Sequence, residues 1–113
     1  MDPNCVFCKI IAGQIPGETV LETEVGIAIR DVGPQAPTHI LVIPREHVAG
    51  MDALPAASST WNALIRLAQA VALREGLDNG FRLVINQGAD GGQTVGHLHL
   101  HVLGGRAMGW PPG

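Results

Sequence analysis

The sequence predicts an α+β fold, in which an antiparallel five-stranded sheet carries one long helix on a face and a short helix near the N-terminus. Five short segments are rich in β-branched and apolar residues, and several of them alternate, which is typical of strands. One longer segment repeats apolar residues at helical spacing. Glycines and prolines separate these segments, and no long linker interrupts them.

The N-terminal half is expected to hold the short helix and three of the strands. Residues 5–12 (CVFCKIIA) predict the helix, which Gly13 ends. Three strands are predicted at residues 18–23, 25–31 and 38–43. The first two are joined tightly at Glu24–Gly26, and Pro44 closes the third. The following residues 47–57 are expected to be irregular.

The C-terminal half is expected to hold the long helix and the last two strands. Residues 59–75 carry a broad apolar face, with Ser58 or Ser59 as the N-cap and Gly76 at the end. The strands are predicted at residues 81–86 and 97–103, joined by a glycine-rich loop over residues 87–96.

Length, charge and hydropathy narrow the class of protein. The 113 residues (11.8 kDa) fit a single domain over 1–113, with a C-terminal tail at 106–113. Lys and Arg number 7 against 10 Asp and Glu, and this net charge of −3 disfavours nucleic-acid binding. No apolar run is long enough for a membrane span and no signal peptide opens the chain, so a cytoplasmic protein is expected.

The small number of serines, lysines and cysteines disfavours several kinds of catalytic site. The only serines, Ser58 and Ser59, do not lie in a strand–turn–helix elbow, which disfavours a serine hydrolase. Lys9 is the only lysine and no phosphate-binding G-x-x-x-x-G-K-[ST] motif is present. The two cysteines, Cys5 and Cys8, are too few and too close for a disulfide framework.

Three of the five histidines occupy alternate positions in one predicted strand. His97, His99 and His101 therefore share one face of the sheet, while Leu98 and Leu100 point to the other. Each imidazole brings two nitrogens that need partners, so three in one stripe favour function over packing. Two chemistries use such a stripe: metal binding and nucleophilic catalysis.

The glycine-rich loop before this strand favours nucleophilic catalysis on a phosphate. Residues 86–94 (NQGADGGQT) offer free backbone N–H groups, amide side chains and a hydroxyl, which suit an anion. Taken alone, such a loop is more often a plain connection. Its position beside the histidines is what makes phosphate binding the better interpretation.

Four motifs in the same order resemble the histidine triad (HIT) superfamily, in its nucleotide-binding HINT branch. They are CVFCKIIAGQIP, RDVGPQAPTHILVIPREH, NQGADGGQTVGHLHLHVLGGR and the terminal WPPG, and the resemblance covers essentially the whole chain. It implies a HIT-like fold and a homodimer that binds purine nucleotides such as AMP or GMP. It also implies hydrolysis of the P–N bond that joins AMP to an amine, with no cofactor required for catalysis.

The resemblance assigns catalytic roles to the histidines. It makes His99 the nucleophile that forms a nucleotidyl-histidine intermediate and then releases AMP. His101 is implied to bind phosphate and handle protons, and His97 to support them. His39, on a neighbouring strand, is near enough in the predicted sheet to reach the other three.

The resemblance also implies the nucleotide contacts. Asp31 would accept the ribose hydroxyls, although a loop cap is the structural alternative. Phosphate contacts are implied for the side chains of Asn86 and Thr94, and the loop adds the Gln93 amide and the backbone N–H groups of Gly92 and Val95. Trp110, in the tail, would reach toward the partner subunit's site. The chain departs from the family pattern at Thr94, where serine is usual, and at Gly96, where a bulkier residue is usual.

Cys5 and Cys8 admit two further interpretations. One interpretation is that they are two small residues of a short helix. The other, which the resemblance implies because some histidine triad relatives bind zinc at matching positions, is half of a zinc site completed by His47 and His97. A redox pair would need a preceding strand, and only four residues precede Cys5. A structural zinc therefore stays an open possibility.

Three functions from different classes compete. The first is the nucleoside phosphoramidate hydrolase, the second a nucleotide-binding scaffold with incidental catalysis, and the third a zinc hydrolase with the three histidines as ligands. The complete triad argues against the second as the sole role. The glycine-rich loop and Asp31 argue against the third. The physiological amine and the choice between adenine and guanine stay open.

Overall fold

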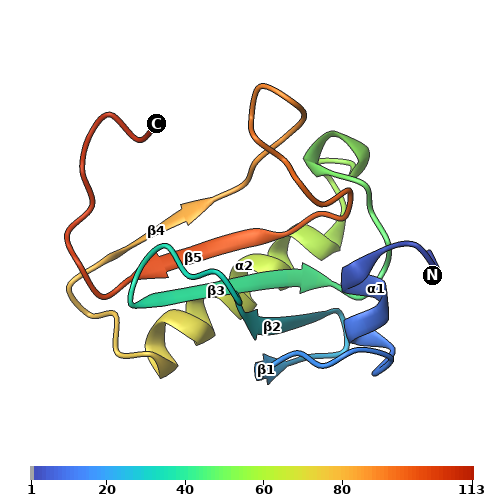
Figure 1. Cartoon of the computed structure of the whole chain (residues 1–113), viewed down its shortest axis with the longest axis horizontal. Helices are drawn as coiled ribbons and strands as arrows, with labels where there is room; N and C mark the ends of the chain where they lie inside the picture. The colour runs from blue at the N-terminus through green and yellow to red at the C-terminus, as the bar shows by residue number, and fades with distance from the viewer. Residues whose placement is uncertain (1) are drawn as a thin grey trace.

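The computed structural model describes residues 2–113 and has eight elements of secondary structure (Figure 1). The helices are α1 (Val6–Ile11), the 3₁₀ helix η1 (Met51–Ala53) and α2 (Ser59–Arg74). The strands are β1 (Thr19–Glu22), β2 (Gly26–Arg30), β3 (Thr38–Pro44), β4 (Phe81–Val84) and β5 (Leu100–Gly104). They form one sheet in the order β1-β2-β3-β5-β4, and all neighbours are antiparallel. The predicted fold class is therefore confirmed.

The α-helices α1 and α2 both begin at side-chain caps. The Cys5 Sγ accepts a hydrogen bond from the Cys8 N–H (3.4 Å), and the Ser58 Oγ accepts one from the Thr60 N–H (3.2 Å). Gly76 follows α2 with φ +68°, a left-handed conformation that ends helices and that glycine adopts without strain. The boundaries predicted from the sequence agree with these caps.

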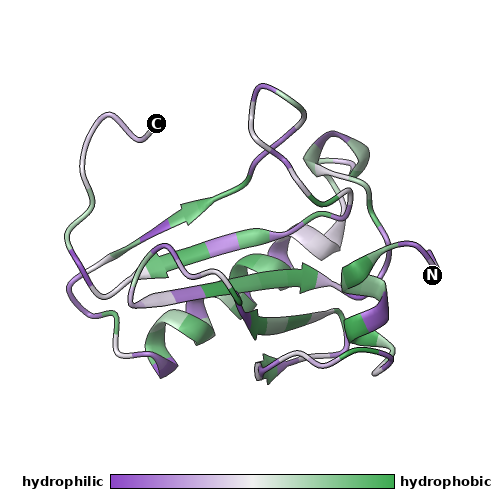
Figure 2. Ribbon diagram, viewed as in Figure 1, coloured by the Kyte–Doolittle hydropathy of each residue, from purple (hydrophilic) through white to green (hydrophobic). Residues whose placement is uncertain are grey.

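The sheet separates two apolar layers. On one face, α2 packs Leu64, Leu67 and Val71 against strand residues that include Val42 and Val102. On the other face, the short helix α1 packs over the opposite side chains of β2 and β3 and lies near the end of β3 (Figure 1). The strands are accordingly apolar over most of their length (Figure 2), while the exposed positions of α2 include the polar residues Asn62, Arg66 and Gln69. None of the helices over residues 2–113 has the length and apolar character to span a bilayer.

The last strand begins later than the sequence predicts. Pairing of β3 with β5 runs from Thr38 opposite Gly104 to Val42 opposite Leu100 and stops there. The N–H of Leu98 instead donates to the carbonyl of Val48, in the segment after β3 (2.7 Å). Residues 97–99 thus leave the ladder and lie against the segment that follows β3, although side chains still alternate between the two layers. Two smaller predictions also differ from the structure. Pro44, expected to follow the third strand, is the last residue of β3, and Ile65, predicted on the apolar face of α2, is 38% exposed.

Candidate active site

Four imidazoles gather on the α1 side of the sheet, where β3 and the chain entering β5 run side by side. The rings of His99 and His101 are 4.9 Å apart and those of His39 and His101 are 5.1 Å apart, measured between centroids. His97 lies deeper and is fully buried, whereas His39 and His99 are buried and His101 is half-buried. The structure therefore brings the three sequence-predicted histidines and His39 into one cluster.

The hydrogen bonds of His99 leave one nitrogen free. Its Nδ1 lies 2.8 Å from the backbone carbonyl of His97, and because a carbonyl only accepts, Nδ1 must carry the proton. Nε2 of a neutral ring is then an unprotonated lone pair. Phe7 contacts the ring edge-on, with centroids 5.1 Å apart, and fixes its plane. This is the arrangement that a nucleophilic imidazole requires.

His39 and His101 form a directed chain of hydrogen bonds. The backbone N–H of Gln35 donates to Nδ1 of His39 (3.0 Å), so the proton of the neutral ring lies on Nε2. That N–H faces Nδ1 of His101 at 2.9 Å, with a carboxylate oxygen of Asp31 at 3.4 Å as a second acceptor. His101 consequently carries its own proton on Nε2. This atom is buried and has no partner among the described residues.

Burial keeps these histidines neutral. Burial, with smaller contributions from the neighbouring His99 and His39, lowers the pKa of His101 to about 4. Burial also lowers the pKa of His39, an effect that Asp31 partly offsets, and the pKa of His97, where the hydrogen bond to the Pro44 carbonyl acts in the opposite direction. At neutral pH the His101 ring is therefore neutral, with its N–H on Nε2.

A cavity of about 380 Å³ opens beside His99 and His101. Its apolar walls come from α1, from the turn after it and from β2, and its polar groups from Asp31 and Thr94. The size and mixed lining suit a nucleoside monophosphate. Its lining residues are Val6, Phe7, Ile10, Ile15, Pro16, Ile29, Arg30, Asp31, Val32, Leu41, Thr94, Val95, His99 and His101.

The predicted phosphate loop is held by its own glutamine. The Gln93 Oε1 accepts from the Gly88 N–H (3.0 Å), and its Nε2 donates to the carbonyls of Ala49 (2.9 Å) and Val95 (3.1 Å). The side-chain amide of Gln93 is thus engaged within the loop. Gly92, at φ +76°, makes the turn that brings Thr94 and Val95 to the cavity.

Two other predicted contacts lie outside the cavity lining. Asn86 follows the end of β4, and it does not border the cavity in this single chain. Trp110 is 84% exposed and its ring lies 5.9 Å from the guanidinium carbon of Arg82 on β4. The tail therefore runs beside the outer edge of the sheet, as Figure 1 shows.

In the apolar wall contributed by α1, Val6 and Phe7 are the residues that the sequence did not single out, whereas Ile10 was a candidate for contact with the base. Val6, Phe7 and Ile10 lie at positions i, i+1 and i+4 and therefore share one face of the helix. That spacing is visible in the sequence and could have suggested a helix face lining a site. Ile15 and Pro16 contribute from the turn that follows, where no periodicity marks them.

Cys5, Cys8, His47 and His97 meet in a second, adjoining cluster. Their potential ligand atoms all lie within 4.8 Å of one another. Nδ1 of His97 is 3.3 Å from Cys5 Sγ and 3.6 Å from Cys8 Sγ, and Nδ1 of His47 is 3.3 Å from Cys8 Sγ. In a tetrahedral zinc site, sulfur and nitrogen ligands are separated by about 3.5 Å. The arrangement fits a zinc ion with little rearrangement.

The hydrogen bonds around this cluster also fit a metal. Nε2 of His97 donates to the carbonyl of Pro44 (2.8 Å), which leaves the Nδ1 lone pair directed at the cysteines. Nε2 of His47 faces Asp2, with a carboxylate oxygen at 3.9 Å. Burial raises the pKa of Cys5, so that thiol stays protonated unless a cation displaces its proton. His97 thus contacts the cysteine cluster through its ring and His99 through its backbone carbonyl.

Asp31, His39 and His101 also lie within 4.8 Å of one another, but they do not suit a metal. A histidine that binds a metal through Nε2 normally donates from Nδ1 to an acceptor. Here Nδ1 of His39 receives the Gln35 N–H instead, so Nε2 keeps its proton. The hydrogen-bond chain accounts for this cluster.

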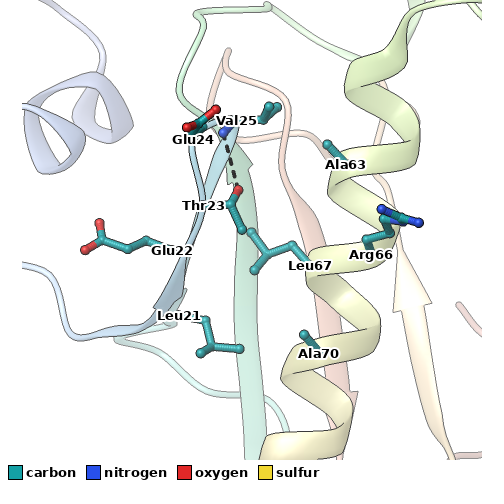
Figure 3. Close-up of a pocket in the computed structure, with 9 residues that line it drawn as sticks. All are labelled: Leu21, Glu22, Thr23, Glu24, Val25, Ala63, Arg66, Leu67 and Ala70. Carbon is teal, nitrogen blue, oxygen red and sulfur yellow. Dashed lines mark hydrogen bonds between the residues drawn. The ribbon is translucent and has the colours of Figure 1, made fainter.

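A larger cavity, of about 470 Å³, lies on the other side of the molecule from the histidines, between the β1–β2 turn and α2 (Figure 3). Leu21 and Val25 face Ala63, Leu67 and Ala70 across it, and Figure 3 shows that its charged groups stand at the rim. It has no histidine, cysteine or convergent polar set, so it offers no chemistry.

A family model, the HIT domain, matches residues 12–108 of this chain. The chain belongs to the histidine triad family. Its relatives include the 14 kDa zinc-binding protein of Zea mays, 47% identical over 99% of this chain and 90% of that protein. They also include the adenylylsulfatase HINT1 of Arabidopsis thaliana, 44% identical over 99% of this chain and 78% of that protein.

Solved HIT structures share the fold closely. A HIT family hydrolase from Legionella pneumophila Philadelphia 1 superimposes with a TM-score of 0.94 at 47% identity, over 97% of this chain and 100% of that one. These comparisons confirm membership of the HIT superfamily, with likeness to its HINT branch. The sheet, the helices and the histidine cluster described above are therefore those of a HIT protein.

Proposed function

We propose that this HIT protein hydrolyses purine nucleoside phosphoramidates, cleaving the P–N bond between AMP and an amine. The observation that carries the proposal is the opposite polarity of two neighbouring rings that line the same cavity: Nδ1 of His99 is held by a carbonyl, which leaves Nε2 as the lone pair, whereas His101 carries its N–H on Nε2. Hydrolysis is also consistent with the name of the Legionella structure, and nucleotide use with the HINT relative. The direct test is to quench the protein during turnover of an AMP amide and to look for AMP bound to His99 by mass spectrometry.

The reaction proceeds in two displacements at phosphorus. In the first, Nε2 of His99 forms a bond to phosphorus while the P–N bond breaks, and the amine takes up one proton as it leaves. In the second, water attacks the phosphorus, the bond to His99 breaks and AMP is released. The His97 carbonyl holds Nδ1–H of His99 and stabilises the positive charge that the ring acquires in the adduct.

His101 is the proton donor that the site presents. Its Nε2–H passes the proton to the leaving nitrogen. The Nε2–H of His39, which donates to Nδ1 of His101, stabilises the negative charge left on the His101 ring. The water that attacks the adduct returns a proton to Nε2. Protons and charge therefore balance over the cycle without a metal. His97 takes no proton, because its two nitrogens face Pro44 and the cysteines.

We infer that the nucleoside occupies the 380 Å³ cavity, with the base against the aliphatic walls, the ribose at Asp31 and the phosphate near Thr94 and Val95. Asn86 and the backbone N–H of Val95 would complete the phosphate contacts. The backbone N–H of Gly92, which the sequence also suggested, already donates to the carbonyl of Ala89 (3.0 Å) and is not free for a ligand. The Gln93 side chain supports the loop rather than the ligand in this proposal, since its amide already has three partners.

Replacing Asp31 with Asn should weaken AMP binding and leave binding of inorganic phosphate nearly unchanged. Asn keeps a side-chain acceptor for the Gly33 N–H (2.8 Å), so the loop is preserved while the charge is lost. Loss of charge-assisted hydrogen bonds to the ribose should cost on the order of 1.5–3 kcal/mol. Titration calorimetry with both ligands measures this, and equal weakening of the two would show that Asp31 does not contact the ribose.

We propose that the active form is a two-fold dimer built on the free edge of β4 and on α2. Phe81 (44% exposed) and Leu83 (37%) lie on β4 on the α2 side of the sheet, and burying them needs a partner surface. An isologous dimer would pair these surfaces and bring the tail with Trp110 toward the partner's cavity.

Sedimentation at micromolar concentration should therefore give twice the 11.8 kDa mass of one chain. Leu83→Asp should give the monomer, because the charge would be buried at the interface. Val25→Asp is the matched control, since Val25 is 38% exposed at the opposite edge of the sheet. A monomeric wild-type protein, or a dimer that survives Leu83→Asp, contradicts the proposal.

We also infer that the Cys5–Cys8–His47–His97 cluster binds a structural zinc. The ligand spacing and the Pro44 carbonyl on His97 support this, as does the name of the Zea mays relative. Zinc would supply a cross-link between α1, the end of β3 and the chain entering β5. Catalysis would not require it, because the reacting nitrogen belongs to His99 and is not among the ligands. A cytoplasmic location, where thiols stay reduced, accords with such a site.

A second candidate reaction is cleavage of adenylyl sulfate, which the Arabidopsis relative's name favours. The same His99 attack on phosphorus would expel sulfate instead of an amine. Sulfate is a good leaving group without a proton, whereas an amine needs one from His101. His101→Ala should therefore affect the amide far more than the sulfate. Comparing the two substrates on that variant distinguishes the reactions.

A further inference from the structure

Gln35, in the loop between β2 and β3, makes three hydrogen bonds. The Gln35 N–H donates to Nδ1 of His39 (3.0 Å), and its side-chain Nε2 donates to the carbonyl of Gly33 (3.0 Å). Its own carbonyl accepts from Nη2 of Arg106 (2.9 Å), a residue that follows β5. Gln35 thus connects the start of the C-terminal tail to the histidine cluster.

The Gln35 N–H decides where the proton of His39 lies. Because the Gln35 N–H donates to Nδ1 of His39, the ring proton of His39 must be on Nε2. There it faces two acceptors, Nδ1 of His101 and a carboxylate oxygen of Asp31. His101 then carries its proton on Nε2, a buried atom that has no hydrogen-bond partner within residues 2–113. Without the Gln35 N–H, the proton of His39 can move to Nδ1, and Nε2 becomes an acceptor. His101 would then protonate Nδ1 and turn a lone pair, instead of a donor, toward the substrate phosphate.

Arg106 holds the loop from outside. Its Nη1 donates to the carbonyl of Ala107 (3.0 Å), which orients the guanidinium while Nη2 reaches Gln35. Gly105 precedes it at φ +90°, and a Cβ there would lie 2.9 Å from the Cβ of Pro37. The chain therefore lies against the far end of the same loop, and the loop is fixed between β3 and the tail.

We propose that Gln35 and Arg106 are positioning residues that set the tautomer of His39 and, through it, the polarity of His101. Neither touches the cavity, so their effect is on the state of the ring and not on substrate contact. The inference adds two residues to the proposed hydrolytic site, and only its kinetic test depends on the proposed function. The tautomers themselves can be measured in the free protein.

The experiment uses ¹⁵N-labelled histidine and NMR of the ring nitrogens at neutral pH. The wild-type protein should show His39 and His101 protonated at Nε2 alone. Gln35→Pro removes the N–H and should shift both rings toward the other tautomer, whereas Gln35→Ala keeps the N–H and should not. Arg106→Ala should give a smaller shift in the same direction, and Arg106→Lys, which keeps one donor, should restore part of it. Arg66→Ala on α2 is the control, because Arg66 is exposed and makes no ion pair within residues 2–113.

Kinetics on an AMP amide provide the second readout. We expect kcat to fall by about tenfold in Gln35→Pro, as befits a weakened proton donor, with a much smaller change in KM. If ring tautomers stay as in the wild type in both Gln35→Pro and Arg106→Ala, the proposal is overturned, even if kcat falls. If Gln35→Pro does not fold, the ring tautomers measured in Arg106→Ala and Arg106→Lys test the proposal. If the wild-type protein does not hydrolyse the amide, the proposed function fails while the NMR result still stands or falls on its own.

Discussion

His99→Ala should abolish turnover of an AMP amide while AMP still binds. The substitution removes the one imidazole whose Nε2 lone pair borders the cavity, so no bond to phosphorus can form. We expect the rate to fall by roughly 10⁴-fold or more, as for other catalytic nucleophiles. Asp31 and Thr94 stay in place, so the affinity for AMP should change only a few-fold. Single-turnover kinetics and calorimetry measure the two effects, and AMP binding also reports that the variant is folded.

The stereochemistry at phosphorus provides the sharpest check on His99. Two successive displacements invert phosphorus twice, so a chiral phosphoramidate should yield product with overall retention. A zinc-bound hydroxide would attack once and invert. Inversion would therefore rule out the covalent mechanism even if every binding prediction held. His101→Ala is the comparison variant: it should slow the amide reaction less than His99→Ala, because the adduct can still form.

Removing the metal, or one of its ligands, should lower thermal stability more than any surface substitution. Zinc would join three segments that are distant in sequence, and its loss should cost several kcal/mol. For a domain of this size that corresponds to a decrease in Tm of about 10–20 °C. Cys8→Ala should show the lower Tm and no response to added zinc, while the wild-type protein should lose the same stability on treatment with a chelator.

Lys9→Ala provides the control for Cys8→Ala, because Lys9 is the neighbouring residue on α1 and is not a ligand. At temperatures well below both transitions, chelation should leave the rate of amide hydrolysis unchanged. Purified protein with no zinc by elemental analysis, together with a Tm insensitive to chelator, would contradict the zinc site. A rate that falls with the metal at low temperature would contradict the metal-free mechanism.

Much of the fold could be predicted because each element carries its own local signal. Ser58 caps α2, Gly76 ends it and alternation marks the strands. The late start of β5 could not be predicted, because the alternation from His97 onward is perfect in the sequence. What ends the ladder is a tertiary contact, the hydrogen bond from Leu98 to Val48, and no local pattern reports it.

The site divides in the same way between local and tertiary information. The histidine spacing placed His99 and His101 on one face, and the cysteine spacing with His47 and His97 suggested the metal cluster. The direction of the hydrogen bonds, which determines what each ring can do, depends on the carbonyl of His97 and the N–H of Gln35. These are backbone groups, and their residue types carry no signal. The spacing of Phe7 on α1 placed it on an apolar helix face, but nothing in the sequence indicated that this face lies against His99 and lines the cavity.

Helix α1 has only six residues, which is too short to be stable in isolation. Its Phe7 contacts the rings of both His97 (5.8 Å) and His99 (5.1 Å), and its Val6 and Ile10 wall the cavity. Local opening of this one turn and a half would dismantle the site while the sheet and α2 stayed folded. In the metal-free protein, heat inactivation should therefore precede global melting, and the amides of α1 should exchange with solvent faster than those of β3.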